Sequence, residues 1–122
     1  MGTLVAFHAH PDDEAISTGG SMARAHYEGH RVVLVIATGG EHGEVPDDLA
    51  PGETLAARRR AETQRSAAVL GVDRLVWLDY HDSGMTGWEA NQDSRSFWLA
   101  DVDEAAGRLA DVLREERADV LT

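Results

Sequence analysis

The sequence of 122 residues contains no cysteine and no lysine. Without cysteine, disulfide bonds and thiolate metal ligands are excluded, so any metal ion must be held by histidine and carboxylate side chains. Without lysine, a Schiff-base mechanism that uses a residue of this chain is excluded. No apolar run is long enough to span a membrane and no signal-peptide pattern is present, so we expect a soluble, cytoplasmic protein.

Basic residues are scarce: 11 arginines stand against 22 acidic residues, for a formal net charge of −11. A surface of this sign repels nucleic-acid phosphates and fits a neutral or cationic substrate, or a site in which a cation offsets the local charge. Apolar residues make up 43% of the sequence, which is typical of a globular protein. We therefore expect one domain over residues 1–122.

Apolar, β-branched runs alternate with helical patterns along the chain. Such alternation predicts βαβ units, and hence an α/β fold with a mainly parallel sheet and flanking helices. We expect strands at 3–8, 31–38, 74–78 and 119–122, helices at 15–28, 55–70 and 99–116, and long loops at 39–53 and 79–96. The apolar face of the first helix is expected to carry Ile16, Met22, Ala23 and Tyr27. In parallel sheets ligands bind outside the carboxyl ends of the strands, so the segments after each strand should meet there.

Four polar side chains of metal-ligand or proton-carrier type follow the first strand in the stretch His10-Pro11-Asp12-Asp13-Glu14. Histidine and aspartate are ordinary zinc ligands, and a neighbouring carboxylate can act as a general base. Acidic residues at this position also suit the start of a helix, where they cap it or favour its dipole. Spacing alone leaves both interpretations open, and the position at the ligand-binding edge favours a metal site.

Several segments, in order along almost the whole chain, resemble the PIG-L/LmbE-like family of zinc-dependent N-deacetylases. The first is Val5-Ala6-Phe7-His8-Ala9-His10-Pro11-Asp12-Asp13-Glu14, which resembles the signature of the family. The others are Thr38-Gly39-Gly40-Glu41-His42-Gly43-Glu44, Arg59-Arg60-Ala61-Glu62, Leu70-Gly71-Val72 and Asp82-Ser83-Gly84-Met85. The last is similar to a loop of the branch that acts on mycothiol and its precursors.

This resemblance implies a Rossmann-like fold and removal of an acetyl or other acyl group from the amide of an amino sugar. It implies that His10 and Asp13 bind zinc and that Asp12 is the general base for the attacking zinc-bound water. Positions that the resemblance assigns to substrate binding are Ser17, Glu44, Arg59, Asp82 and Met85. The third zinc ligand of the family follows its fourth strand, so we expect it beyond residue 122 and expect this chain to be an N-terminal part of a longer enzyme.

The remaining histidines are weaker candidates for a site. His26 and His30 are expected at the far end of the first helix, away from the ligand edge, and His8 is expected to be a packed, hydrogen-bonded strand residue. His42 and His81 fall in the two long loops, where they could approach a metal or a substrate.

Other functions stay open at this point. A mycothiol S-conjugate amidase shares the same motifs, and a non-catalytic domain could keep the fold alone. A nucleotide-binding module is disfavoured, because the turn after the first strand is acidic and lacks a glycine-rich phosphate loop. The metal could also be Fe(II), Mn(II) or Co(II), and the sequence leaves a homo-oligomer open.

Overall fold

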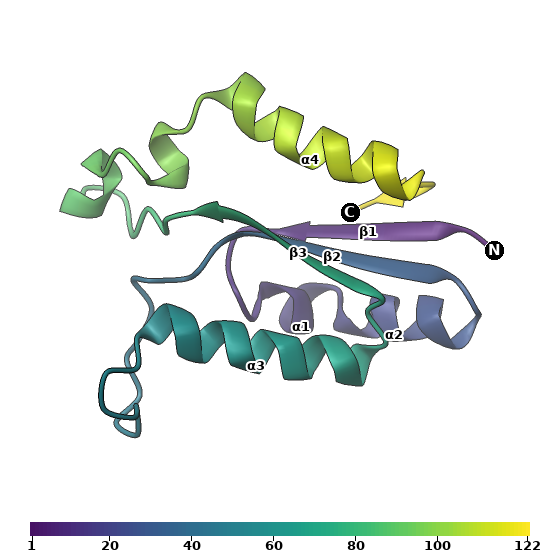
Figure 1. Ribbon diagram of the computed structural model, residues 1–122, viewed down its shortest axis with the longest axis horizontal. Coiled ribbons are helices and arrows are strands. Elements are labelled where there is room, and N and C mark those ends of the chain that lie inside the picture. The colour runs from purple at the N-terminus through teal and green to yellow at the C-terminus, as the bar shows by residue number, and fades with distance from the viewer.

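The computed structural model describes all 122 residues as a four-stranded sheet with helices on both faces (Figure 1). The strands lie in the order β3-β2-β1-β4, and every neighbouring pair is parallel, which confirms the α/β prediction. In chain order the elements are β1 (Thr3–His8), α1 (Asp13–Ser17), α2 (Gly19–Tyr27), β2 (Arg31–Thr38), α3 (Leu55–Leu70), β3 (Arg74–Tyr80), the 3₁₀ turns η1 (Glu89–Gln92) and η2 (Phe97–Leu99), α4 (Val102–Glu116) and β4 (Val120–Leu121).

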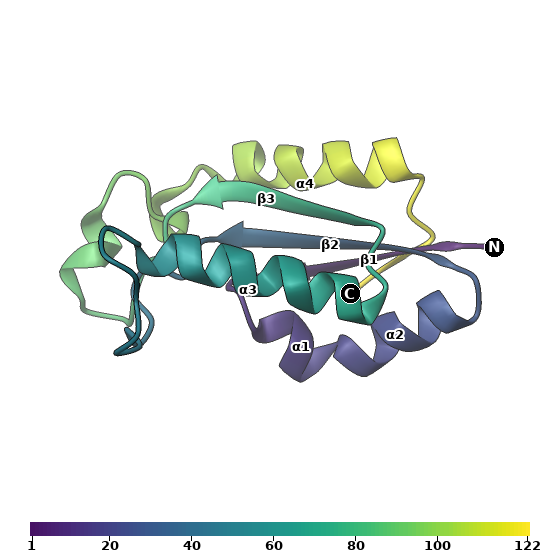
Figure 2. The same cartoon turned by 60° about the horizontal axis from the view of Figure 1, so that its bottom comes forward.

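Strand β2 is the centre of the core, because helices cover it on both sides. Helices α1, α2 and α3 lie on one face of the sheet and α4 on the other (Figures 1 and 2). Alternate residues of β2 face the two layers: Leu34 packs with Met22 of α2, and Val35 belongs to the cluster that includes Val112 of α4. A strand buried on both faces reads as a continuous apolar run, which is why residues 31–38 were predictable.

Helix α3 has the bounds that the sequence predicts, since both ends carry their own signals. The Thr54 side chain accepts a hydrogen bond from the Ala57 N–H at 3.1 Å, which caps the first turn. Gly71 ends the helix at φ +77°, a left-handed conformation that favours glycine.

The single helix expected over 15–28 is wrong, because the structure divides it into α1 and α2. Thr18 stands between them at φ −129°, and its hydroxyl donates to the Glu14 carbonyl at 3.2 Å. The break changes which side chains are covered: Met22 is fully buried, whereas Ile16 and Tyr27, expected on the apolar face, are 83% and 82% exposed.

Two boundaries differ from the predictions for local reasons. Helix α4 begins at Val102 rather than at residue 99, because Asp101 accepts a hydrogen bond from the Glu104 N–H at 2.9 Å and acts as the N-cap. Strand β3 continues to Tyr80, two residues beyond the expected end, since Tyr80 still pairs with Thr38 after an irregularity in the register.

No helix combines the length and the apolar character that a membrane crossing requires.

Glu116 at the end of α4 joins the helix to the sheet and gives the first testable prediction. Its carboxylate accepts hydrogen bonds from Arg31 at 2.6 and 3.2 Å and from Arg74 at 2.9 Å, which lower its pKa from 4.5 to about 2. A lowered pKa stabilises the fold above the unfolded value, and this stabilisation is lost as the pH falls from about 4.5 towards 2. We expect Glu116→Gln to lower the free energy of unfolding by about 2 kcal/mol at pH 7, and by much less near pH 2. Urea unfolding at the two pH values measures this; an equal loss at both would show that the charge plays no part.

Candidate metal and substrate site

The turn His10–Asp13 leaves the carboxyl end of β1 and enters α1 directly. The Ala9 carbonyl accepts hydrogen bonds from the N–H and the hydroxyl of Thr38 on β2, at 3.0 and 2.9 Å, so the start of the turn is fixed to the sheet. Asp12 then adopts φ +88°, a conformation that L residues rarely take and that Asp tolerates better than most. This backbone turn separates the side chains of neighbouring acidic residues.

Helix capping, the alternative to metal binding, is not what these acids do. Asp12 occupies the N-cap position of α1 but its side chain makes no capping hydrogen bond. The Asp13 carboxylate turns back to accept the His10 N–H at 3.0 Å. Glu14 is 1% exposed, and burial raises its pKa; its Oε2 has no hydrogen-bond partner.

His10 and Asp13 lie side by side as the sequence predicts. Nδ1 of His10 is 3.4 Å from Oδ2 of Asp13, and both side chains are about two-fifths exposed. Two ligands bound at about 2.0–2.1 Å to one tetrahedral zinc ion are separated by about 3.3 Å. The pair therefore fits two positions of a zinc site.

Asp82, in the loop after β3, approaches the other nitrogen of the same imidazole. Its Oδ1 is 3.3 Å from Nε2 of His10. Because Asp13 and Asp82 face opposite nitrogens of the ring, they do not converge with it on one point, and no group of three or more candidate ligands occurs in the structure. Asp82 instead has the position of a carboxylate that fixes the orientation of a metal-binding histidine.

The Asp82 carboxylate is buried, at 6% exposure, and tightly held. Burial alone would raise its pKa, but hydrogen bonds from the N–H groups of Gly84 (2.9 Å) and His42 (3.1 Å) outweigh this effect, and the pKa lies below the usual value. The nearby His10 ring adds to the lowering. The site thus keeps a negative charge behind His10.

Arg59 of α3 holds the opposite side of the turn. Its guanidinium donates to the Pro11 carbonyl at 2.5 Å, to Oδ2 of Asp12 at 3.1 Å and to the Gly40 carbonyl at 3.1 Å. Gly40 has φ +67°, and a Cβ there would collide with the guanidinium. Arg59 therefore joins the loops that follow β1 and β2 and leaves Oδ1 of Asp12 without a hydrogen bond.

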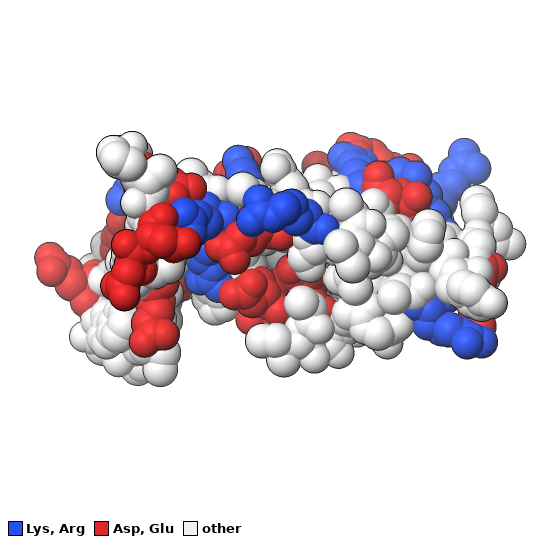
Figure 3. All heavy atoms as spheres, turned by 90° about the horizontal axis from the view of Figure 1, so that it is seen from below, with Lys and Arg blue, Asp and Glu red and all other residues white.

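These loops enclose a cavity of about 380 Å³ at the carboxyl end of the sheet. Acidic side chains gather at this end of the molecule, beside arginines of α3 (Figure 3). The cavity is lined by His10, Pro11, Asp12, Asp13, Ile16, His42, Gly43, Arg59, Asp82, Gly84, Met85 and Trp88.

The cavity includes most of the residues that the resemblance assigns, but not all. Ser17, the last residue of α1, and Glu44, in the loop after β2, are both exposed and do not line it. Sequence alone places His42 among the weaker candidates and does not assign Ile16 to the site, although both line the cavity. His42 carried a signal, as a polar residue in a loop after a strand, whereas the side of α1 that Ile16 presents depends on the break at Thr18.

Asn91 holds the loop that carries Met85 and Trp88 in place by hydrogen bonds to its backbone. The Asn91 amide donates to the Ser83 and Met85 carbonyls at 2.7 and 3.1 Å and accepts the Gly87 N–H at 2.8 Å. Asn91 is 5% exposed, so these bonds are shielded from water. Asp82, Met85 and η1 therefore keep fixed positions relative to one another.

The other weak candidates lie away from the cavity. Nε2 of His8 is 2.8 Å from the Thr18 hydroxyl, the packed role that the sequence predicts. His30 accepts the Gly2 N–H at 3.0 Å, and the His26 ring lies against Gly71, both at the opposite end of the strands.

Comparison with known proteins gives the same family over nearly the whole chain. The model of the PIG-L family, described as GlcNAc-PI de-N-acetylase, matches residues 5–122. A protein of Nocardiopsis dassonvillei named 1D-myo-inositol 2-acetamido-2-deoxy-alpha-D-glucopyranoside deacetylase is 48% identical, and the alignment covers 93% of this chain and 44% of that protein. The chain thus spans less than half the length of this curated relative.

Two solved structures show what the fold alone conveys. The N,N'-diacetylchitobiose deacetylase from Pyrococcus horikoshii aligns with a TM-score of 0.76 and 32% identity, over 98% of this chain and 39% of that one. The 4-carboxy-2-hydroxymuconate hydratase GalB from Pseudomonas putida aligns with a TM-score of 0.75 at only 21% identity, over 99% of this chain and 46% of that one. Since a deacetylase and a hydratase share the architecture, the fold alone does not identify the reaction, and the residues at the site must do so.

Proposed function

Because the chain belongs to the PIG-L family, we propose that it carries the metal-binding turn and part of the substrate site of a hydrolase that removes an acetyl group from the amide nitrogen of an amino sugar. The observation that carries this proposal is the pair formed by His10 and Asp13, with nitrogen and oxygen 3.4 Å apart at the wall of a cavity. The Asp12 carboxylate lines the same cavity without belonging to the pair.

His10 and Asp13 would hold the metal ion, for which zinc suits the nitrogen and oxygen donors. When bound, such an ion polarises an amide carbonyl and lowers the pKa of water. We further propose that residues 1–122 form a single domain of a cytoplasmic protein.

Asp12 is the proposed proton carrier. Its Oδ2 is held by Arg59 at 3.1 Å, which fixes the carboxylate and leaves Oδ1 to accept a proton from the attacking water. The same Oδ1 can later return this proton to the leaving amine, so that the carboxylate ends the cycle as it began. Asp82 and Arg59 act as positioning residues for His10 and Asp12.

The relatives' names suggest that the substrate is an acetylated amino sugar linked to inositol. Met85 and Trp88 give the cavity an apolar wall against which a sugar ring can pack, and Arg59 and the buried Asp82 line it with polar groups. Ser17 and Glu44 remain predicted substrate contacts, with exposed side chains that do not reach the cavity as it stands.

Metal titration combined with an acetate assay tests the proposal. We expect Zn²⁺ to shift the NMR signals of His10 and Asp13 and to leave those of His26 and His30 unchanged, because the latter lie at the opposite end of the strands. Acetate release from 1D-myo-inositol 2-acetamido-2-deoxy-α-D-glucopyranoside should require the metal and stop when a chelator is added. Acetate release that a chelator does not affect would overturn the metal role. Zn²⁺ binding at the turn without acetate release, in this chain and in one of the relatives' length, would leave a non-catalytic domain.

A further inference from the structure

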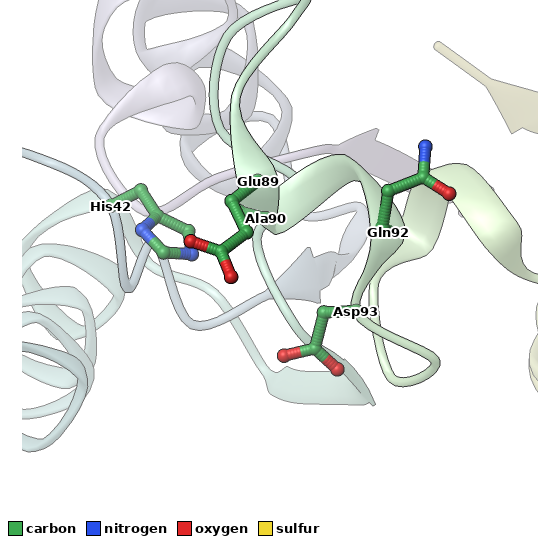
Figure 4. A pocket seen from close by; sticks show the side chains of 5 residues that line it. All are labelled: His42, Glu89, Ala90, Gln92 and Asp93. Carbon is green, nitrogen blue, oxygen red and sulfur yellow. The ribbon is translucent and has the colours of Figure 1, made fainter.

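A second cavity of about 450 Å³ adjoins the first and is not explained by the reaction (Figure 4). It is lined by His42, Glu89, Ala90, Gln92 and Asp93. His42 lines both cavities, and its ring meets that of Trp88 edge-on, with centroids 6.3 Å apart. His42 thus lies at the boundary of the two cavities, and a ligand beside His10 and Asp13 that is longer than one sugar ring reaches the second cavity where it extends past His42.

The wall of the second cavity is fixed relative to the first. Glu89 begins η1 directly after Trp88, and Asn91 of the same turn is hydrogen bonded to the loop that carries Met85. On the other side, the His42 backbone is bonded to Asp82, which lies against His10. The two cavities thus form one preorganised surface rather than two independent hollows.

The charge of the second cavity comes mainly from Glu89. The Asp93 carboxylate is paired with Arg95, at 2.7 and 3.0 Å, and these hydrogen bonds hold its pKa well below the usual range. Glu89 makes no ion pair, and its carboxylate shares the cavity with the His42 ring (Figure 4). The cavity therefore offers an unneutralised hydrogen-bond acceptor and no free cation.

We propose that this cavity binds the uncharged, hydroxyl-bearing group attached to the amino sugar, and that Glu89 discriminates against substrates with a phosphate on that group. The inference rests on the proposed function and extends it to the second half of the substrate. A carboxylate accepts hydrogen bonds from hydroxyl groups, whereas a phosphate brings one or two negative charges to a site where only negative charge is unpaired. The formal net charge of −11 acts in the same direction.

Binding of two matched ligands tests the proposal without requiring turnover. The probes are 1D-myo-inositol 2-acetamido-2-deoxy-α-D-glucopyranoside and the same glycoside with a phosphate on the inositol ring, titrated into the metal-free chain and followed by the NMR signals of His42 and Ala90. We expect the neutral glycoside to shift both signals and to bind more tightly than the phosphorylated one. Glu89→Gln should shrink the difference in affinity by about three- to tenfold, the effect of one carboxylate on a phosphate at roughly 7 Å.

Glu62→Gln is the matched control, since Glu62 is an exposed acid of α3 that lines neither cavity and makes no ion pair. It removes the same charge and should leave the difference in affinity unchanged. Equal affinities for the two glycosides in the unsubstituted chain, an equal response to the two substitutions, or Ala90 signals that do not move would overturn the proposal. If instead only the proposed deacetylation were wrong, no acetate would be released, but the selectivity between the two glycosides and the shifts of the Ala90 signals would persist.

Discussion

Asp12→Asn is expected to lower turnover by about 10²- to 10⁴-fold while metal binding at His10 and Asp13 is kept, because the substitution removes the proton acceptor and its charge but keeps the size and shape of the side chain. Asparagine has the size of aspartate, and its side-chain oxygen can still accept the hydrogen bond from Arg59. It also tolerates the φ of +88° that Asp12 adopts, so the turn should survive. Acetate release and Zn²⁺ titration on the same preparation measure the two effects separately.

Asp48→Asn provides the control for this prediction. Asp48 is also paired with an arginine, Arg58, at 2.9 Å, but it lies in the loop after β2 and lines neither cavity. Its substitution should leave turnover unchanged. If Asp12→Asn kept full turnover, the proton would have to go elsewhere and the role given to Asp12 would be wrong. If it lost metal as well, Asp12 would belong to the ligand set.

The second large effect is expected at His10. His10→Ala removes one of two ligands, and we expect the affinity for Zn²⁺ to fall by at least about 100-fold, since even changes behind a ligand cost about 10- to 100-fold. Asp82→Asn, which changes only the group behind the ring, should cost less, about tenfold. Calorimetric titration with Zn²⁺ measures both.

His30→Ala is the matched control for His10→Ala, because His30 also lies in a short connection between a helix and a strand, yet at the other end of the strands, where its ring accepts the Gly2 N–H. The affinity of the His30→Ala variant for Zn²⁺ should equal that of the unsubstituted chain. Zn²⁺ binding that survives His10→Ala but not His30→Ala would move the metal site away from the turn.

Deacetylase and hydratase structures share this fold, so the fold alone does not identify the reaction and substitutions in the site are needed. The architecture places the ends of β1, β2 and β3 at one edge, but any of several reactions can use that edge. At that edge this chain places a histidine and an aspartate 3.4 Å apart and the separate carboxylate of Asp12. The substitutions above test those groups directly.

Local signals were enough for much of the architecture. The apolar run of β2 indicated a strand covered on both faces, and Thr54 and Gly71 marked the ends of α3. The same reasoning failed for residues 15–28, because the division at Thr18 depends on a hydroxyl-to-backbone bond and on packing of α2 against the sheet. Periodicity alone does not contain either contact, so Ile16 and Tyr27 were placed on the wrong side.

By itself, the sequence determined the α/β class, the edge of the sheet at which the loops after the strands meet and the residue types available there: histidine and carboxylate, with no thiolate and no lysine. These follow from alternation of strands and helices and from composition, which are local properties of the chain. Only the tertiary structure decided which side chains meet. It placed Asp13 and Asp82 on opposite nitrogens of His10, joined Arg59 to Asp12, and set Glu89 across a cavity from His42. Such contacts join loops far apart in sequence, and their geometry depends on backbone turns, like that of Asp12, that no residue pattern specifies.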